Sequence, residues 1–356
     1  MMLLSRRDFG RFGGGALIVG LAARGGPIWA REPARGIDPL RFVAPELRAA
    51  AMPFYQPNQE SQWSDEGLAK MRAARATPET PWLTDVPVEQ LKVPVGKGHP
   101  DVTIYIINAK AGTRRPGILH THGGGYILGS ARSEVTYEQG IAKELDCVVV
   151  TVEYRLAPET TYIGSVEDIY AGLTWMHQNS ARIGLDPTRL AVMGESAGGG
   201  LAARLAITAR DRGQVPLCAQ ILVYPMLDDR TGSTIQLPPW IGAVLWTPAA
   251  NRFGWKSFLG MSPGGSDVPA AAVPARVSDL SRLPPAFIGV GSVDLFMRED
   301  IEYGRRLIEA GVPVALDVVP GAFHAFDRIA PDTDLARRFT REKMNALRKA
   351  FGQETL

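Results

Sequence analysis

The sequence predicts an α/β fold in which a mostly parallel sheet is flanked by helices. Apolar runs alternate with helical stretches along the chain, as expected when parallel strands are joined by crossover helices. The runs are continuously apolar, which is typical of strands covered on both faces. Strands are expected near residues 92–95, 102–107, 117–121, 147–153, 189–194, 218–224, 286–291 and 314–319.

Helices are expected between these strands and before the first one. Ser165 followed by Asp168 resembles a capping box, which places the start of one helix at Ser165. Gly311 followed by Pro313 is a stop signal for another. The expected helices lie near residues 45–52, 64–75, 133–145, 165–179, 197–212, 298–310 and 332–350.

Composition bounds the class of protein. The chain has 356 residues, of which 45% are hydrophobic and 21% charged, so it can form one large core or a core with a lid. The net charge is only +2. Composition therefore gives no reason to expect nucleic acid or an anionic membrane as a partner.

The first thirty residues read as an export signal. Arg6 and Arg7 precede an apolar, glycine-rich run over 12–23. This run of about 12 residues is too short for a bilayer, which needs about 20. We expect a twin-arginine (Tat-type) signal cleaved after Ala30, and hence a periplasmic or extracellular protein without a stable membrane anchor. The alternative is a disordered basic tail.

The segment Gly194-Glu195-Ser196-Ala197-Gly198 follows an apolar run and precedes a helical run of small residues. A Gly-x-Ser-x-Gly sequence between a strand and a helix is typical of a nucleophile elbow, whose sharp turn exposes the serine hydroxyl. Such common residues also fit an ordinary glycine-rich turn. Ser196 is therefore a candidate nucleophile that needs a second motif.

The second motif is His122-Gly123-Gly124-Gly125, directly after the apolar run 117–121. Loops of this type supply backbone N–H groups to an oxyanion hole. Glycines suit the task because a bare backbone can approach a reacting carbonyl closely. One strand and one helix separate the two motifs, as this architecture requires. Together they predict acyl transfer at Ser196.

With these motifs the chain resembles the bacterial hormone-sensitive-lipase-like esterases of the α/β-hydrolase superfamily. Two departures are conservative: Glu195 stands where the family most often has Asp, and Asp294 is followed by Leu-Phe rather than Pro-Leu. The resemblance covers about residues 90–350 and rests on segments 122–125 (HGGG), 153–159 (EYRLAPE), 194–199 (GESAGG) and 321–324 (GAFH).

The resemblance implies an α/β-hydrolase fold with a mostly parallel eight-stranded sheet, flanking helices and a helical cap. The long aromatic stretch 226–282 exceeds an ordinary connection and is expected to cover the site; a peripheral helical subdomain is the alternative. The expected organisation is a signal peptide (1–30), a cap segment (31–90), the first part of the core (91–225), a cap insertion (226–282) and the second part of the core (283–356).

Chain order selects the other catalytic groups, because this fold places the acid and then the histidine after the serine. Of five histidines, only His324 follows Ser196. Among the carboxylates between them, Asp294 directly follows the apolar run 286–291, and catalytic groups gather at the carboxyl ends of strands. Glu299 and Asp300 are expected to serve the following helix dipole instead.

These residues predict a Ser196–Asp294–His324 triad acting through an acyl-enzyme. The N–H of Ala197 follows from the elbow as an oxyanion donor, and the resemblance points to Gly124 and Gly125 as the others. No cluster of Cys or closely spaced His suggests a zinc site, and the chemistry calls for no metal or organic cofactor.

Neighbouring motif residues have supporting roles. His122 and Gly123 belong to the glycine loop, where His122 is expected to brace the backbone. Glu195 is expected to support loops rather than react. Ion pairs that hold loops are the expected role of residues 153–159.

The function expected is a serine carboxylesterase acting on small to medium acyl esters. The same triad would serve an amidase, a lactonase or another deacylase, and motifs alone do not separate these activities. A non-catalytic ligand-binding protein on the same scaffold is disfavoured because all three catalytic groups are present.

Cys147 and Cys218 each lie at the start of a strand. An exported protein could carry a disulfide. The strand order of the resembled fold separates these strands by three positions, or about 14 Å, which exceeds the ~7 Å limit for a bridged pair of Cα atoms. Two free thiols are therefore expected.

Overall fold

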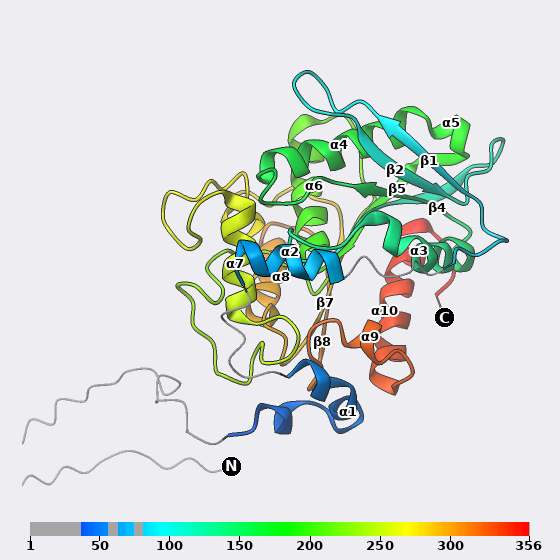
Figure 1. Ribbon diagram of the computed structural model, residues 1–356. Coiled ribbons are helices and arrows are strands. Elements are labelled where there is room, and N and C mark those ends of the chain that lie inside the picture. Colours follow the sequence, from blue (N-terminus) through cyan, green and yellow to red (C-terminus); the bar gives the residue numbers. More distant parts are fainter. Residues whose placement is uncertain (1–36, 56–62, 75–80, 356) are drawn as a thin grey trace, which may run out of the picture. The chain divides into compact units, whose positions relative to one another are not determined.

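One sheet of eight strands, in the order β1-β2-β4-β3-β5-β6-β7-β8, organises the computed structural model, which describes residues 37–55, 63–74 and 81–355 (Figure 1). β1 and β2 pair antiparallel, as do β2 and β4, and the remaining strands are parallel. The predicted fold class is confirmed. The strands are β1 (Val88–Val93), β2 (Val102–Ile107), β3 (Arg115–Thr121), β4 (Val148–Glu153), β5 (Leu185–Glu195), β6 (Ala219–Val223), β7 (Ala286–Gly291) and β8 (Val314–Val319).

Helices cover both faces of the sheet (Figure 1). The α-helices are α1 (Arg48–Ala51), α2 (Asp65–Ala74), α3 (Ala131–Glu144), α4 (Tyr162–Gln178), α5 (Ser180–Ile183), α6 (Ala197–Arg212), α7 (Pro248–Leu259), α8 (Met297–Glu309), α9 (Phe326–Ile329) and α10 (Asp334–Phe351). Short 3₁₀ helices are η2 (Pro39–Phe42), η3 (Pro45–Leu47), η4 (Met52–Phe54) and η6 (Pro274–Arg276).

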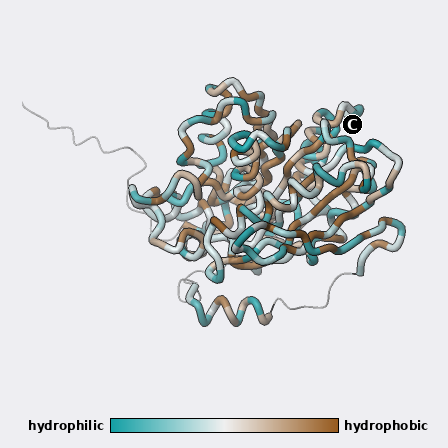
Figure 2. The backbone as a smooth tube through the Cα atoms, turned by 90° about the horizontal axis from the view of Figure 1, so that it is seen from above, coloured by the Kyte–Doolittle hydropathy of each residue, from teal (hydrophilic) through white to brown (hydrophobic). Residues whose placement is uncertain are grey.

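The core consists of two layers, one on each face of the sheet. Successive side chains of a strand point to opposite faces, so Val150 and Val152 belong to the layer that includes α4, α6 and α8, whereas Val149 belongs to the layer that includes α3 and α10. Figure 2 shows the apolar segments mostly within the body formed by the sheet and its helices. The continuous apolar runs of the sequence arise from this two-sided burial.

The structure corrects the start of one helix. α4 begins at Tyr162, so Ser165 lies one turn inside it rather than at its cap. The Ser165 hydroxyl donates to the carbonyl of Arg155 at 2.8 Å, and Asp168 accepts two hydrogen bonds from the Arg155 guanidinium, each at 2.8 Å. The apparent capping box is in fact a clamp on the loop that follows β4.

One boundary and the two cysteines can be compared with the prediction. β1 begins at Val88, so the core starts slightly before the predicted boundary at residue 91. Cys147 and Cys218 are both free, and the strands they precede, β4 and β6, lie three positions apart in the sheet, as expected. The predicted signal peptide lies outside the described residues. No helix in the described part of the chain is long and apolar enough to cross a membrane.

Candidate active site

Ser196 lies in a tight turn between β5 and α6. Its backbone is strained, with φ 58° and ψ −122°, and its N–H donates to the carbonyl of Val223 at 2.9 Å. A Cβ at Gly198 would lie 2.0 Å from the carbonyl oxygen of Thr121, so only glycine lets α6 approach β3 this closely. The predicted strand–turn–helix context of the serine is therefore present.

Ser196, His324 and Asp294 are brought together at the carboxyl ends of three different strands. The Ser196 Oγ lies 2.9 Å from Nε2 of His324, and Nδ1 of the same ring lies 2.8 Å from Oδ2 of Asp294. The other Asp294 oxygen accepts the N–H of Phe296 at 2.9 Å. Because Nδ1–H donates to the carboxylate, Nε2 of the neutral ring is free to accept the serine proton.

Two aromatic rings hold the imidazole of His324 from different sides. Tyr224 packs edge-on at a centroid distance of 4.9 Å and Phe296 at 5.2 Å. The Tyr224 hydroxyl donates to Asp327 at 3.0 Å. Ring orientation is thus set by packing as well as by the bond to Asp294.

The glycine loop passes over the elbow, and two of its glycines are required by geometry. Gly124 has φ +122°, and a Cβ there would lie 2.1 Å from the carbonyl oxygen of Leu128. Gly125 has φ +62°, and a Cβ there would lie 2.0 Å from the Trp246 ring. Ala197 is the first residue of α6, where backbone N–H groups have no intrahelical acceptor.

His122 lies behind this loop rather than in the cavity. Its Nδ1–H donates to the carbonyl of Gly123 at 2.8 Å, and its ring stacks on Tyr154 at 4.1 Å. The Tyr154 hydroxyl donates to the His122 carbonyl at 2.8 Å. Burial lowers the pKa of His122 to about 4, so the ring is neutral. These contacts hold the backbone of the glycine loop in place.

A cavity of about 880 Å³ opens above Ser196. Its walls are mainly apolar and aromatic, and its two arginines are engaged: Arg72 with Glu159 at 2.5 Å and Arg328 with Glu134 at 2.9 Å. The residues lining it include Phe54, Trp63, Met71, Leu128, Leu156, Tyr224, Leu245 and Trp246. Side chains from before the core and from the 226–282 segment therefore share one wall.

Two other carboxyl groups near the end of β7, Glu299 and Asp300, make no hydrogen bond to His324. The Glu299 carboxylate accepts the N–H groups of Leu227 and Asp228 at 2.6 and 3.1 Å. Glu299 and Asp300 are both buried in the first turn of α8, and burial raises both pKa values well above the ordinary range. The prediction that these two acids interact with the helix dipole did not anticipate their burial. Burial favours the neutral form of a carboxyl group.

Sequence reasoning missed the partners of Glu195. Its Oε2 lies 2.8 Å from Nε2 of His120, a strand residue, and Glu138 from α3 pairs with the other ring nitrogen. The contact is therefore with a strand rather than with a loop. The available signal was that His120 and Glu195 end neighbouring strands of the expected sheet.

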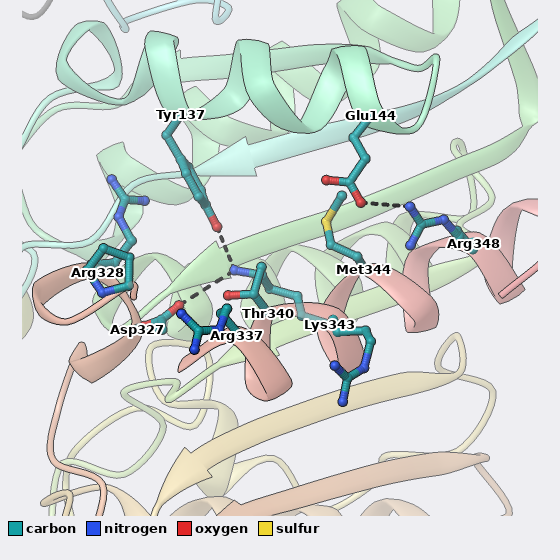
Figure 3. Close-up of a pocket in the computed structure, with 11 residues that line it drawn as sticks. Tyr137, Glu144, Asp327, Arg328, Arg337, Thr340, Lys343, Met344 and Arg348 are labelled. Atoms are coloured by element: carbon teal, nitrogen blue, oxygen red, sulfur yellow. Dashed lines mark hydrogen bonds and ion pairs between the residues drawn. The ribbon is translucent and has the colours of Figure 1, made fainter. Parts of the chain in front are cut away.

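A second cavity, of about 550 Å³, is lined by α3, α9 and α10 (Figure 3). The buried Lys343 ammonium donates to the Tyr137 hydroxyl at 2.6 Å and lies 3.7 Å from Asp327. Arg328 lines both cavities. Asp327 thus links this basic cavity, through Tyr224, to the ring of His324.

Among the described residues, no group of three His, Cys, Asp or Glu side chains could hold a metal ion.

Comparisons with known proteins identify the family of the chain. The family model for the alpha/beta hydrolase fold matches residues 118–328. The carboxylesterase NlhH of Mycobacterium tuberculosis is 33% identical over 292 residues, which cover 80% of this chain and 85% of that protein. The solved structure of a bacterial heroin esterase has a TM-score of 0.75 and 34% identity, covering 88% of this chain and 99% of that one. The chain therefore belongs to the α/β-hydrolase family, in its hormone-sensitive-lipase-like branch, and is a serine carboxylesterase.

Proposed function

We propose that Ser196, His324 and Asp294 are the catalytic triad of this carboxylesterase. The observation that carries the proposal is the continuous chain of contacts from Ser196 Oγ to His324, 2.9 Å, and from His324 to Asp294, 2.8 Å. Ser196 follows β5, Asp294 follows β7 and His324 follows β8, in the chain order nucleophile, acid and histidine that is typical of this fold.

The mechanism follows from the contacts. His324 Nε2 takes the serine proton while Oγ attacks the ester carbonyl, and Asp294 stabilises the imidazolium that forms. The N–H groups of Gly124, Gly125 and Ala197 stabilise the oxyanion. His324 then protonates the departing alcohol, and water, deprotonated by the same ring, hydrolyses the acyl-enzyme.

The substrate class we propose is small to medium acyl esters. The 880 Å³ cavity with aromatic walls supports this range. Similar proteins include the arylesterase of Saccharolobus solfataricus, 32% identical over 209 residues, and the ethyl acetate hydrolase of Pseudomonas putida, 31% identical over 224 residues.

The test is hydrolysis of p-nitrophenyl esters of increasing acyl length without added metal, beside matched anilides and lactones. Ser196→Ala should lower kcat by several orders of magnitude with the fold intact, while Ser180→Ala on the distant α5 should not. Near-normal turnover by folded Ser196→Ala would exclude the assignment. Preference for anilides or lactones would change the substrate class.

A two-part cap is also proposed, formed by residues 31–90 and 226–282. Trp63 from the first part packs against Trp246 and Phe253 from the second, at 5.5 and 6.1 Å between ring centroids. Truncating Trp63 to Ala should broaden the accepted ester range, which the same ester series would measure.

Export through the twin-arginine route is proposed from Arg6 and Arg7 ahead of a short apolar run. Replacing both arginines by Lys should leave precursor in the cytoplasm, as measured by fractionation. Normal export of this variant would indicate a general secretory signal instead.

A further inference from the structure

Three ionisable side chains form a buried row beside the nucleophile: Glu138 from α3, His120 from β3 and Glu195 from the end of β5. His120 Nε2 lies 2.8 Å from the Glu195 carboxylate, and its Nδ1 pairs with Glu138 and lies 3.3 Å from the Thr151 hydroxyl. Glu138 is 0% exposed, His120 1% and Glu195 7%. His120 and Glu138 are therefore shielded from water, while Glu195 forms the end of the row that borders the active-site cavity.

Within this row the charges of His120 and Glu195 support one another, whereas burial raises the pKa of Glu138 although His120 opposes the shift. Burial opposes the charge on His120, but the two carboxylates override it and hold the pKa of His120 well above its ordinary value. Burial likewise opposes the charge on Glu195, but the His120 charge lowers the pKa of Glu195 to about 2. Both ring nitrogens of a protonated histidine donate, which matches the two acceptors. His120 and Glu195 thus form a lasting ion pair at neutral pH.

Two further cations act on Glu195. Lys343 on α10 and Arg328 on α9 both favour its ionised form. Lys343 is itself held by Tyr137 and Asp327 (Figure 3). The ionised form of Glu195 is therefore favoured by a histidine of the sheet and by the cations of two helices.

The His120–Glu195 pair joins the two backbone segments on which the reaction depends. His120 lies two residues before the glycine loop, and Glu195 directly precedes Ser196. The two segments already touch: a Cβ at Gly123 would lie 3.1 Å from the Glu195 carbonyl oxygen. A shift of either strand end would move the nucleophile relative to the oxyanion donors.

We propose that His120 and Glu138 are positioning residues that, through Glu195, hold the nucleophile elbow in register with the oxyanion loop. The inference rests on the proposed role of Ser196. Small displacements of reacting groups cost up to about 100-fold in rate. We therefore expect Glu195→Gln to lower kcat about 10- to 100-fold with KM nearly unchanged.

The variants separate the effect of the Glu195 charge from the effect of its side-chain size. Glu195→Asp keeps the charge and should retain more activity than Glu195→Gln, which keeps the size. Glu138→Gln should have a smaller effect, because it leaves the His120–Glu195 pair intact. His120→Gln should be the most damaging, and if it fails to fold the other three variants still decide.

The readouts are kcat and KM with a p-nitrophenyl ester, the rate of Ser196 phosphorylation by diethyl p-nitrophenyl phosphate, and the melting temperature. The matched control is Asp186→Asn, which breaks a partly buried pair with Arg189, 3.2 Å, near the start of β5 and outside both the active-site cavity and the proposed cap. It should lower the melting temperature without changing kcat.

The proposal holds if kcat and the phosphorylation rate fall together in Glu195→Gln and recover partly in Glu195→Asp. It is overturned if Glu195→Gln lowers only the melting temperature, as the control does. An active Ser196→Ala protein would instead refute the proposed function, so the two failures are distinguishable.

Discussion

Two acid–histidine arrangements flank the same serine, and they differ in what the second ring nitrogen meets. In one, His324 has the Asp294 carboxylate on Nδ1 and the Ser196 hydroxyl on Nε2. In the other, His120 has a carboxylate on each nitrogen. The first ring can accept a proton and return it, whereas the second is a fixed cation. Both rings are buried, so burial does not explain their different roles. The group that contacts the second ring nitrogen decides whether the histidine can act as a base or stays a structural charge.

The largest effect should come from the carboxylate of the first arrangement. Asp294→Asn should lower kcat by about 10⁴, by analogy with the serine protease triad, because the ring tautomer is no longer fixed. Steady-state kinetics beside Asp300→Asn checks it, because Asp300 is a buried carboxyl of the same region without a contact to His324. A silent Asp294→Asn with an inactive Asp300→Asn would move the triad acid to Asp300.

The oxyanion loop should rank next. Gly125→Ala adds a methyl group at φ +62° where a Cβ would lie 2.0 Å from the Trp246 ring. Loss of an oxyanion donor costs about 10²–10³ in kcat, and displacement of this loop should approach that loss. If Gly125→Ala changes KM alone, the loop shapes the pocket without stabilising charge.

A third histidine sharpens the comparison through pH. His122 lies two residues from His120, yet its pKa is lowered to about 4, mainly by burial, while that of His120 is raised. A lowered histidine pKa stabilises the fold fully above the ordinary value of 6.5, and this contribution is lost as pH falls from 6.5 to about 4. The shift corresponds to about 3 kcal/mol.

Urea unfolding across pH 7.5 to about 4.5 tests this difference. Wild type should lose stability steadily, and His122→Asn should lose less over the same range. The raised pKa of His120 has the opposite effect on the pH dependence of stability. Because His120 is present in both proteins, its contribution cancels in the comparison. Parallel curves would mean that folding does not shift the pKa of His122.

The smallest effect should come from the thiols. Burial raises the pKa of Cys147 to about 12 and that of Cys218 to about 11, so neither is a nucleophile at neutral pH. Iodoacetamide should leave activity unchanged, and titration of the denatured, unreduced protein should give two thiols. Two thiols appearing only after reduction would contradict the strand separation.

The sequence predicted the fold and the grouping of Ser196, Asp294 and His324 because each depends on local motifs or on chain order. It did not predict Glu138, because which face of α3 meets His120 depends on how the helix packs on the sheet. The predicted start of α4, at Ser165, was wrong because it too depends on contacts made in the folded protein. The polar groups of Ser165 and Asp168 bind Arg155 in the loop between β4 and α4, and these contacts outweigh the local capping pattern.

The wall shared by Trp63 and Trp246 has a consequence for engineering. The two rings are far apart in sequence but meet edge to face at 5.5 Å, so each ring limits the conformations open to the other. Libraries that vary only the 226–282 segment would leave Phe54, Trp63 and Met71, which line the same cavity, unexplored. Comparisons between recombinant versions should therefore keep these three residues constant.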